Sequence, residues 1–208
     1  HGFRIKRSTE TQILTFAQNI YNNLRNHQQT DVVIMDFAKA FDKVPHNKLI
    51  QKLNRYGIKG PINKWIESFL PERVQRVVCD GAKSSWEAVT SGVPQGSVIG
   101  PILFLVYIND LPAGLKSNVR LFADDTIVYL AVSSTKEAEI LQADLDRLTK
   151  WETRWQMEFH PKKCNVIRIT KKKKPFIYNY SLRGHILEEQ ESAKYLGITI
   201  NNKFSWNE

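Results

Sequence analysis

Two adjacent acids, Asp124 and Asp125, stand between two short apolar runs in the segment Val119–Leu130. Like charges this close destabilise each other unless a cation neutralises them, so an acidic pair between strands suits metal binding. The plainer interpretation is a tight turn, because Asp tolerates the backbone angles that turns require. The pair alone leaves both interpretations open.

A third acid, Asp36, ends the unbroken apolar run Val32–Met35. Such a run is typical of a buried strand, and its last residue would lie where the strand meets solvent. Carboxylates from neighbouring strands can meet at one edge, and Mg²⁺ prefers a few carboxylate oxygens together with substrate phosphates. Two such ions can hold the attacking and leaving oxygens of an in-line displacement. The three acids therefore fit phosphoryl transfer, although Asp36 alone would also suit a cap.

The elements that must position these acids follow from the hydrophobic pattern. Capping residues at 8–11 precede apolar residues at helical spacing from Ile13 to Leu24. Runs separated only by Asp124-Asp125 indicate a hairpin. Further helices are predicted at 47–56, 61–70, 102–108 and 135–157, and strands at 31–36, 74–79, 86–90, 166–170, 177–182 and 194–200. This order predicts the α+β class, with a sheet backed by helices.

Composition narrows the class of protein. The 208 residues suit one domain or slightly more, and the formal net charge of +9 favours a polyanionic partner, although many basic proteins bind no nucleic acid. Cys79 and Cys164 have no paired spacing, which argues against disulfides or zinc and favours a reducing, intracellular setting. The longest apolar run, Val98–Ile108, is too short to cross a bilayer. The chain starts at His1 rather than Met, and we expect a piece of a longer protein.

Five ordered segments resemble the motifs of reverse transcriptases from non-LTR, LINE-type retrotransposons of the jockey kind. Residues 36–42 (Asp-Phe-Ala-Lys-Ala-Phe-Asp) resemble motif A, and 91–101 (Ser-Gly-Val-Pro-Gln-Gly-Ser-Val-Ile-Gly-Pro) resemble motif B. Residues 122–125 resemble motif C, 155–163 motif D and 194–197 motif E. Residues 1–4 with Ser8-Thr9, and 69–77, resemble the stretches before motifs A and B. His160 stands where the family usually has Asn.

The resemblance implies an RNA-directed DNA polymerase, a nucleotidyltransferase that uses two Mg²⁺ ions, with Mn²⁺ as an alternative. Its catalytic acids would be Asp36, Asp124 and Asp125, which would bind the metals together with the backbone carbonyl of Phe37. The nucleotide would contact Phe41, Gln95, Gly96 and Lys163, and the primer end would contact Tyr195, Leu196 and Gly197. Phe41 matches the family's steric gate, where an aromatic ring excludes a ribose 2′-hydroxyl.

Each of these residues also has a plainer interpretation. Phe41 suits core packing, the Gly/Pro loop an ordinary connector, Lys163 a solvated surface position, and 195–197 a simple strand. The run Lys171–Lys174 could follow a phosphate backbone, but a solvated turn is the commoner use of so short a run. Trp151 and Trp155 lie one helical turn apart and fit core packing better than base stacking.

The resemblance further implies the palm of a right-hand polymerase, an antiparallel sheet backed by helices, with part of the fingers and no thumb. Residues 1–30 would end the fingers and form the palm-entry helix, 31–190 would form the palm with motifs A to D, and 191–208 would form the primer grip and the start of the thumb connection. The implied partners are an RNA template, a DNA primer and deoxynucleoside triphosphates, without a membrane. The oligomeric state stays open, and the expected place of action is the nucleus.

Two other classes of function remain open at this point. The chain could be a domesticated or decayed relic that binds nucleic acid without catalysis, although the intact acids and the Gln95-Gly96 pair argue against drift. It could also be a purely structural domain, which would make the ordered motifs an accident. The polymerase interpretation explains the motifs, their order and the basic charge together.

Overall fold

The computed structural model describes residue 2 and residues 5–205. Predictions that fall on His1, Phe3, Arg4 and Trp206–Glu208 therefore lie outside the described residues. The chain divides into two compact units. The sheet unit comprises His1–Ala38, Leu111–Arg154 and Glu158–Glu208, and the helical unit comprises Lys39–Asp110 and Trp155–Met157.

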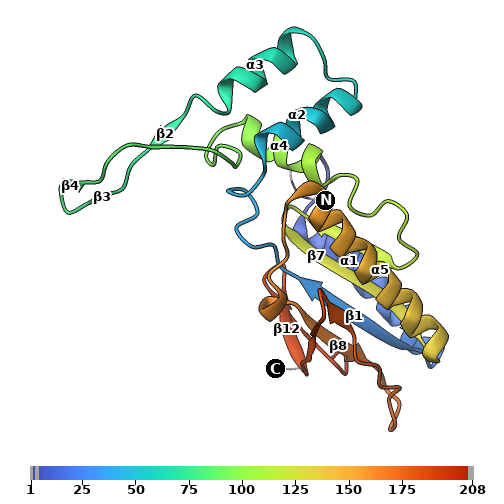
Figure 1. The fold of residues 1–208 in the computed structure, drawn as a ribbon. Coiled ribbons are helices and arrows are strands. Elements are labelled where there is room, and N and C mark those ends of the chain that lie inside the picture. Colours follow the sequence, from blue (N-terminus) through green and yellow to red (C-terminus); the bar gives the residue numbers. More distant parts are fainter. Residues whose placement is uncertain (1, 3–4, 206–208) are drawn as a thin grey trace. The chain divides into compact units, whose positions relative to one another are not determined.

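A five-stranded sheet organises the sheet unit (Figure 1), in the order β11-β8-β1-β7-β6. Its strands are β1 (Gln29–Met35), β6 (Asn118–Phe122), β7 (Asp125–Val132), β8 (Asn165–Ile169) and β11 (Glu188–Glu189). The central strand β1 pairs antiparallel with both β7 and β8, whereas β11 runs parallel to β8. The predicted buried strand therefore lies at the centre of the sheet.

Two helices cover the two faces of this sheet (Figure 1), α1 (Thr9–Arg25) and α5 (Thr135–Trp155). The predicted cap of α1 is confirmed, since Ser8 and Thr11 exchange the two hydrogen bonds of a capping box. A row of side chains four residues apart, Gln12, Phe16, Ile20 and Leu24, is buried. Leu14 and Tyr21, which lie within the apolar pattern of 13–24, are exposed because they lie outside this row.

The last part of the sheet unit differs from its prediction. Of the strand predicted at 177–182, only β9 (Ser181–Leu182) forms, and it pairs with β10 (His185–Ile186). The run predicted as a strand at 194–200 is a hairpin of β12 (Ser192–Tyr195) and β13 (Ile198–Asn201). The turn residues Leu196 and Gly197 have φ values of +49° and +86°. Positive φ at both central positions is the geometry of a two-residue hairpin turn.

The helical unit contains α2 (His46–Arg55), α3 (Pro61–Phe69), α4 (Ile99–Ile108) and a two-stranded ribbon. The ribbon pairs β2 (Val74–Gln75) with β5 (Glu87–Ala88), and β3 (Val78–Cys79) with β4 (Ala82–Lys83). Asp80 and Gly81 form the turn that connects β3 to β4. Trp155 is 3% exposed, in agreement with the predicted core role, and its ring lies 3.9 Å from the buried Lys52 ammonium. Among the described residues, no helix is long and apolar enough to cross a membrane.

Candidate active site

The three acids occupy one end of the sheet in the sheet unit. The last residue pair between the antiparallel strands β1 and β7 is Met35 with Thr126. Asp36, which follows Met35, and Asp125, which precedes Thr126, therefore lie just beyond this pair. Asp125 is itself the first residue of β7 and pairs with Phe122 of β6. Asp124 lies in the turn between β6 and β7. Pairing of β1 with β7 therefore brings acids that are far apart in sequence to the same sheet end.

The turn that carries Asp124 is shifted by one residue from the prediction. Because Phe122 pairs with Asp125, the two connecting residues are Ala123 and Asp124 rather than the two acids. Ala123 has a φ of +52°, a left-handed value at the first turn position that is typical of a type II′ hairpin and costly for a residue other than glycine. Gly2 lies against this turn, since a Cβ at Gly2 would be 2.7 Å from the Ala123 nitrogen.

Like charges act on one another at this sheet end. Burial raises the pKa of the Asp125 carboxyl above its usual range, and the charges of Asp124 and Asp36 raise this pKa further. The Lys163 ammonium reaches this group of acids, since Lys163 Nζ lies 3.2 Å from Asp36 Oδ2. The Lys163 side chain is 64% exposed and that of Asp36 is 41% exposed, so this ion pair is a weak constraint. Lys163, predicted to contact the nucleotide, and Asp36, predicted to bind metal, therefore form an ion pair.

Asp36 is fastened by the segment 158–160. His160 N–H donates to the Asp36 carbonyl at 2.7 Å, and Ala38 N–H donates to the Glu158 carbonyl at 2.8 Å. The Phe37 ring stacks on Phe159 at 4.1 Å. Since carbonyls along an extended chain alternate in direction, the Phe37 carbonyl points away from this segment. That direction keeps the carbonyl available for the metal contact expected of it.

The donor set fits a hard divalent cation. Three carboxylates with mutual repulsion supply the oxygen ligands and the charge that Mg²⁺ requires. Among residues 2 and 5–205, no group of three or more His, Cys, Asp or Glu side chains is arranged closely enough to hold a metal ion. The three carboxylates therefore supply the ligand types that Mg²⁺ prefers, but the described side chains are not gathered into a metal-binding cluster.

The predicted nucleotide residues Phe41, Gln95 and Gly96 belong to the helical unit. The Phe41 ring stacks on Phe104 at 4.4 Å. Its carbonyl accepts a hydrogen bond from Val93 N–H at 2.8 Å. Gly96 has a φ of +78° and open space where a side chain would stand. Phe41 is therefore packed on one face, as its plainer interpretation requires, and half-exposed.

Asp42, in the turn segment before α2, is a residue to which the sequence analysis gave no role. Gln95 Nε2 donates to Asp42 Oδ1 at 2.9 Å, and Ser91 Oγ donates to the Asp42 carbonyl at 2.8 Å. Gly92 allows the approach, because a Cβ there would be 2.7 Å from the Asp42 carbonyl oxygen. Its position as the last residue of the segment that resembles motif A was the signal that could have indicated a role. Motif A and the motif B loop are thus joined within one unit.

A polar cavity of about 540 Å³ adjoins this junction. Lys39, Asp42, Arg73 and Gln95 are among its lining residues. Arg73 donates to the Gly92 carbonyl at 3.2 Å and to the Leu70 carbonyl at 3.1 Å, and burial lowers its pKa. Arg73 lies in the stretch that resembles the segment before motif B, which is the signal that could have marked it. The cavity offers two cationic groups beside the loop.

The predicted primer residues lie on the β12–β13 hairpin. Tyr195 is 2% exposed and accepts a hydrogen bond from Gln12 Nε2 at 3.2 Å. Burial raises the pKa of Tyr195 to about 12. Its ring packs edge-on against Phe16 at 6.1 Å, so the side chain belongs to the core. Gly197 is exposed, and Leu196 is half-buried.

With this geometry described, the class of protein can be stated. Residues 1–200 match the family described as reverse transcriptase (RNA-dependent DNA polymerase). The match covers most of the chain, and the chain belongs to the reverse transcriptase family.

Relatives narrow the class further. The chain is 30% identical to the RNA-directed DNA polymerase from mobile element jockey of Drosophila melanogaster, over 99% of this chain and 23% of the relative. It is 31% identical to the probable RNA-directed DNA polymerase from transposon BS of the same species, over 99% of this chain and 24% of the relative. The predicted resemblance to non-LTR retrotransposon enzymes of the jockey kind is confirmed. The chain spans about a quarter of the length of these relatives.

Solved structures agree on the fold. Apo telomerase from Candida tropicalis matches with a TM-score of 0.62 and 12% identity, covering 95% of this chain and 36% of that one. Telomerase from Candida albicans in complex with a fragment of telomeric RNA matches with a TM-score of 0.61 and 11% identity, covering 94% of this chain and 34% of that one. Identities this low show the fold alone, and they confirm the predicted α+β palm of a right-hand polymerase.

Proposed function

We propose that the protein of which this chain is the palm acts as an RNA-directed DNA polymerase. The primer 3′-hydroxyl attacks the α-phosphate of a deoxynucleoside triphosphate, a new phosphodiester bond forms and pyrophosphate leaves. The observation that carries the proposal is the meeting of Asp36, Asp124 and Asp125 at one end of the sheet, in a chain of the reverse transcriptase family.

Asp36, Asp124, Asp125 and the Phe37 carbonyl would hold two Mg²⁺ ions, with Mn²⁺ as an alternative. When bound, such ions neutralise charge on the phosphate oxygens and favour the alkoxide form of the attacking hydroxyl. The proposal assigns Lys163 to the triphosphate, supported by the 3.2 Å approach of its ammonium to Asp36. Lys163 would exchange the Asp36 carboxylate for a phosphate oxygen once the cations occupy the carboxylates.

Phe41, Gln95 and Gly96 would form the sugar and base side of the nucleotide site. Packing on Phe104 fixes the Phe41 ring, and a fixed ring excludes a 2′-hydroxyl better than a mobile one. The Gln95 amide nitrogen donates its hydrogen bond to Asp42, and the Gln95 amide oxygen would accept a hydrogen bond from the substrate. The open space at Gly96 allows the substrate to approach the backbone.

The turn at Leu196 and Gly197 would contact the primer end, with Tyr195 anchoring the hairpin from the core. In the same proposal, residues 1–30 end the fingers, 31–190 form the palm and 191–208 lead toward the thumb. An RNA template and a DNA primer are the partners, and the reaction takes place in the nucleus at a nicked chromosomal target. These assignments follow the family resemblance.

Primer extension tests the proposal. The chain is given an RNA template, a DNA primer, Mg²⁺ and deoxynucleotides, and is compared with its Asp124→Asn variant. Asp80→Asn is the matched control, because Asp80 is an exposed turn acid whose positive φ Asn tolerates. Extension by the chain and by the control, but not by Asp124→Asn, supports the proposal. Equal extension by Asp124→Asn overturns the proposal. If none of the three proteins extends the primer, the same comparison is made with the full-length protein.

A further inference from the structure

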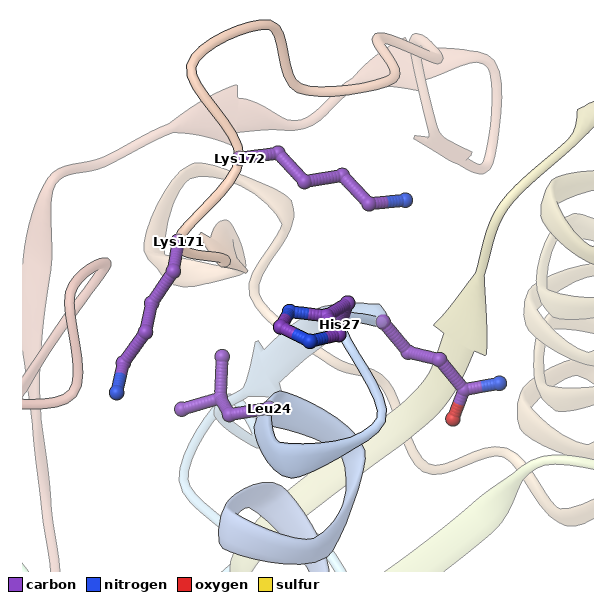
Figure 2. A pocket seen from close by; sticks show the side chains of 5 residues that line it. Leu24, His27, Lys171 and Lys172 are labelled. Carbon is purple, nitrogen blue, oxygen red and sulfur yellow. The ribbon is translucent and has the colours of Figure 1, made fainter.

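Lys171 and Lys172, the first two residues of the lysine run, line a pocket that the proposed polymerase site does not use. The pocket has a volume of about 190 Å³. Leu24, His27 and Gln28 line it from the end of α1, and Lys171 and Lys172 line it from the lysine loop. Figure 2 shows the two lysine side chains leaving the loop in different directions near the His27 ring and Leu24.

The loop that carries these lysines is fastened at both ends. Before the run, Thr170 N–H donates to the Asn202 carbonyl at 3.0 Å. After the run, Phe176 N–H donates to Gln29 Oε1 at 2.9 Å, and Gln29 Nε2 donates to the Phe176 carbonyl at 2.8 Å. Gln29 is fully buried at the start of β1. The lysine loop is therefore held beside the end of α1, so a ligand there meets cations whose backbone is already ordered.

The charges in the pocket are suited to an anion. Within the described part of the chain, neither Lys171 nor Lys172 forms an ion pair with an acidic side chain. The Gln28 amide adds a neutral hydrogen-bonding group. Lys173 and Lys174 continue the run as exposed residues, so the cationic surface extends beyond the volume of a single small anion. A polyanion that follows the run fits this arrangement better than an isolated ion.

The pocket is also distant from the three acids. It adjoins the start of β1, whereas Asp36 follows the end of this seven-residue strand. At about 3.3 Å per residue, the two sites are separated by roughly 20 Å along the strand. A ligand in the pocket therefore leaves the candidate active site open.

We propose that the pocket of Leu24, His27, Gln28, Lys171 and Lys172 binds the phosphodiester backbone of a nucleic acid strand, as a second contact separate from the carboxylates. Lys171 and Lys172 supply charge to phosphate oxygens, and Gln28 donates a hydrogen bond. The contact reads no sequence, because phosphates are the same at every nucleotide. It does not require the polymerase reaction, so binding and primer extension can fail independently.

The test compares two double variants of equal charge. Lys171→Gln/Lys172→Gln removes the lysines that line the pocket, and Lys173→Gln/Lys174→Gln removes their immediate neighbours. Affinity for a fluorescein-labelled single-stranded RNA is measured by anisotropy over a range of salt concentrations, with DNA of the same sequence as a second arm. The pocket variant should lose on the order of tenfold in affinity, and its salt slope should fall by about 1.4, at roughly 0.7 for each lost phosphate contact.

The control variant should lose clearly less affinity than the pocket variant. Equal losses by the two variants would show attraction by net charge alone and overturn the proposal. A second contrary outcome concerns the helix end, since cations near a helix C-terminus stabilise it. If the pocket variant lowers the melting temperature but binds RNA as the control does, the lysines serve α1 rather than a ligand. Loss of RNA binding without loss of DNA binding would retain the site and identify RNA as its ligand.

Discussion

Acidic side chains lie at both ends of the central strand β1, and they differ in burial and in their hydrogen-bond partners. Asp31, near the start of the strand, is fully buried. Tyr180 Oη donates to its Oδ2 at 2.7 Å, and Gln29 Nε2 donates to its Oδ1 at 2.7 Å. Burial raises the pKa of Asp31, while these two hydrogen bonds act against the rise. Each oxygen of Asp31 has a partner supplied by the protein.

Asp36, just beyond the other end, faces like charges instead. Its side chain is 41% exposed, and Lys163 is the cation at 3.2 Å. Asp125 is held beside Asp36 and Asp124, which raise its pKa in addition to burial. A carboxyl satisfied within the fold contributes to stability, whereas carboxyls kept together without enough partners are available to bind cations. The contrast separates a structural acid from candidate catalytic acids on one strand.

The largest expected effect is a separation of activity from stability at Asp36. Asp36→Asn removes one metal ligand and one of the repelling charges, so primer extension should fall at least about a thousandfold. The melting temperature should stay unchanged or rise slightly, because like-charge repulsion is relieved. Extension assays and thermal unfolding of the same preparation measure both quantities. A large fall in melting temperature would place Asp36 in the structural group and break the comparison.

Asp31→Ala should show the opposite pattern, a loss of stability. It leaves the Tyr180 hydroxyl and the Gln29 amide without their acceptor in a buried site, at a cost of about 3 kcal/mol in the free energy of unfolding. Urea denaturation measures this change. Tyr180→Phe is the matched control, because it removes one of the two donors and should cost less. Equal stability of Asp31→Ala and the native chain would contradict the assignment.

A third acid, Glu152, is intermediate between Asp31 and Asp36, because the protein supplies a hydrogen-bond partner to one of its two oxygens. Its Oε1 accepts Phe159 N–H at 2.6 Å, whereas its Oε2 is buried without a hydrogen-bond partner within the described part of the chain. Burial raises the pKa of Glu152 from 4.5 to about 7. The folded state therefore keeps the Glu152 proton at pH values where the unfolded chain has lost it.

The sign of the resulting pH dependence is fixed. For an acid with a raised folded-state pKa, stability is present below the unfolded pKa and is lost as pH rises toward the folded pKa. Between about pH 5 and pH 7 the Glu152 contribution should fall by about 2 kcal/mol. Glu152→Gln should flatten this part of the profile, as measured by urea denaturation at several pH values. A profile identical to that of the native chain would mean that Glu152 does not titrate in this range.

The helices and strands around the site were predicted from local sequence patterns, whereas the side-chain contacts between distant residues were not. The apolar run before Asp36, the cap at Ser8 and the acidic hairpin are local signals that the structure confirms. The hairpin turn was displaced by one residue, because strand pairing rather than residue type decides which two residues connect. The strand predicted at 194–200 failed at Gly197, where a turn signal was present within the apolar run.

Side-chain partners far apart in sequence give no local signal. Tyr180 lies 149 residues from Asp31, and nothing near either residue indicates the other. Asp36 was identified from the apolar run that it ends, and Lys163 through the family resemblance, but their ion pair follows only from the folded backbone. Asp42 had a position in motif A, and its bond to Gln95 required the loop geometry. The candidate catalytic acids could be identified in the sequence because their spacing resembles a family motif, whereas an acid such as Asp31 belongs to no motif.

The smallest expected effect tests the cation directly. If the acids beyond β1 bind Mg²⁺ in the folded state alone, saturation to ten times the dissociation constant should stabilise the chain by about 1.4 kcal/mol. Asp125→Asn should abolish this stabilisation, because it removes a ligand and much of the repulsion that the cation relieves. Asp146→Asn, at an exposed acid of α5, should retain it. Thermal unfolding with and without Mg²⁺ measures the shift, and this readout needs no template, primer or turnover. A shift of equal size in Asp125→Asn would assign the ion to another part of the chain, and the distinction between the two ends of β1 would then rest on hydrogen bonding alone.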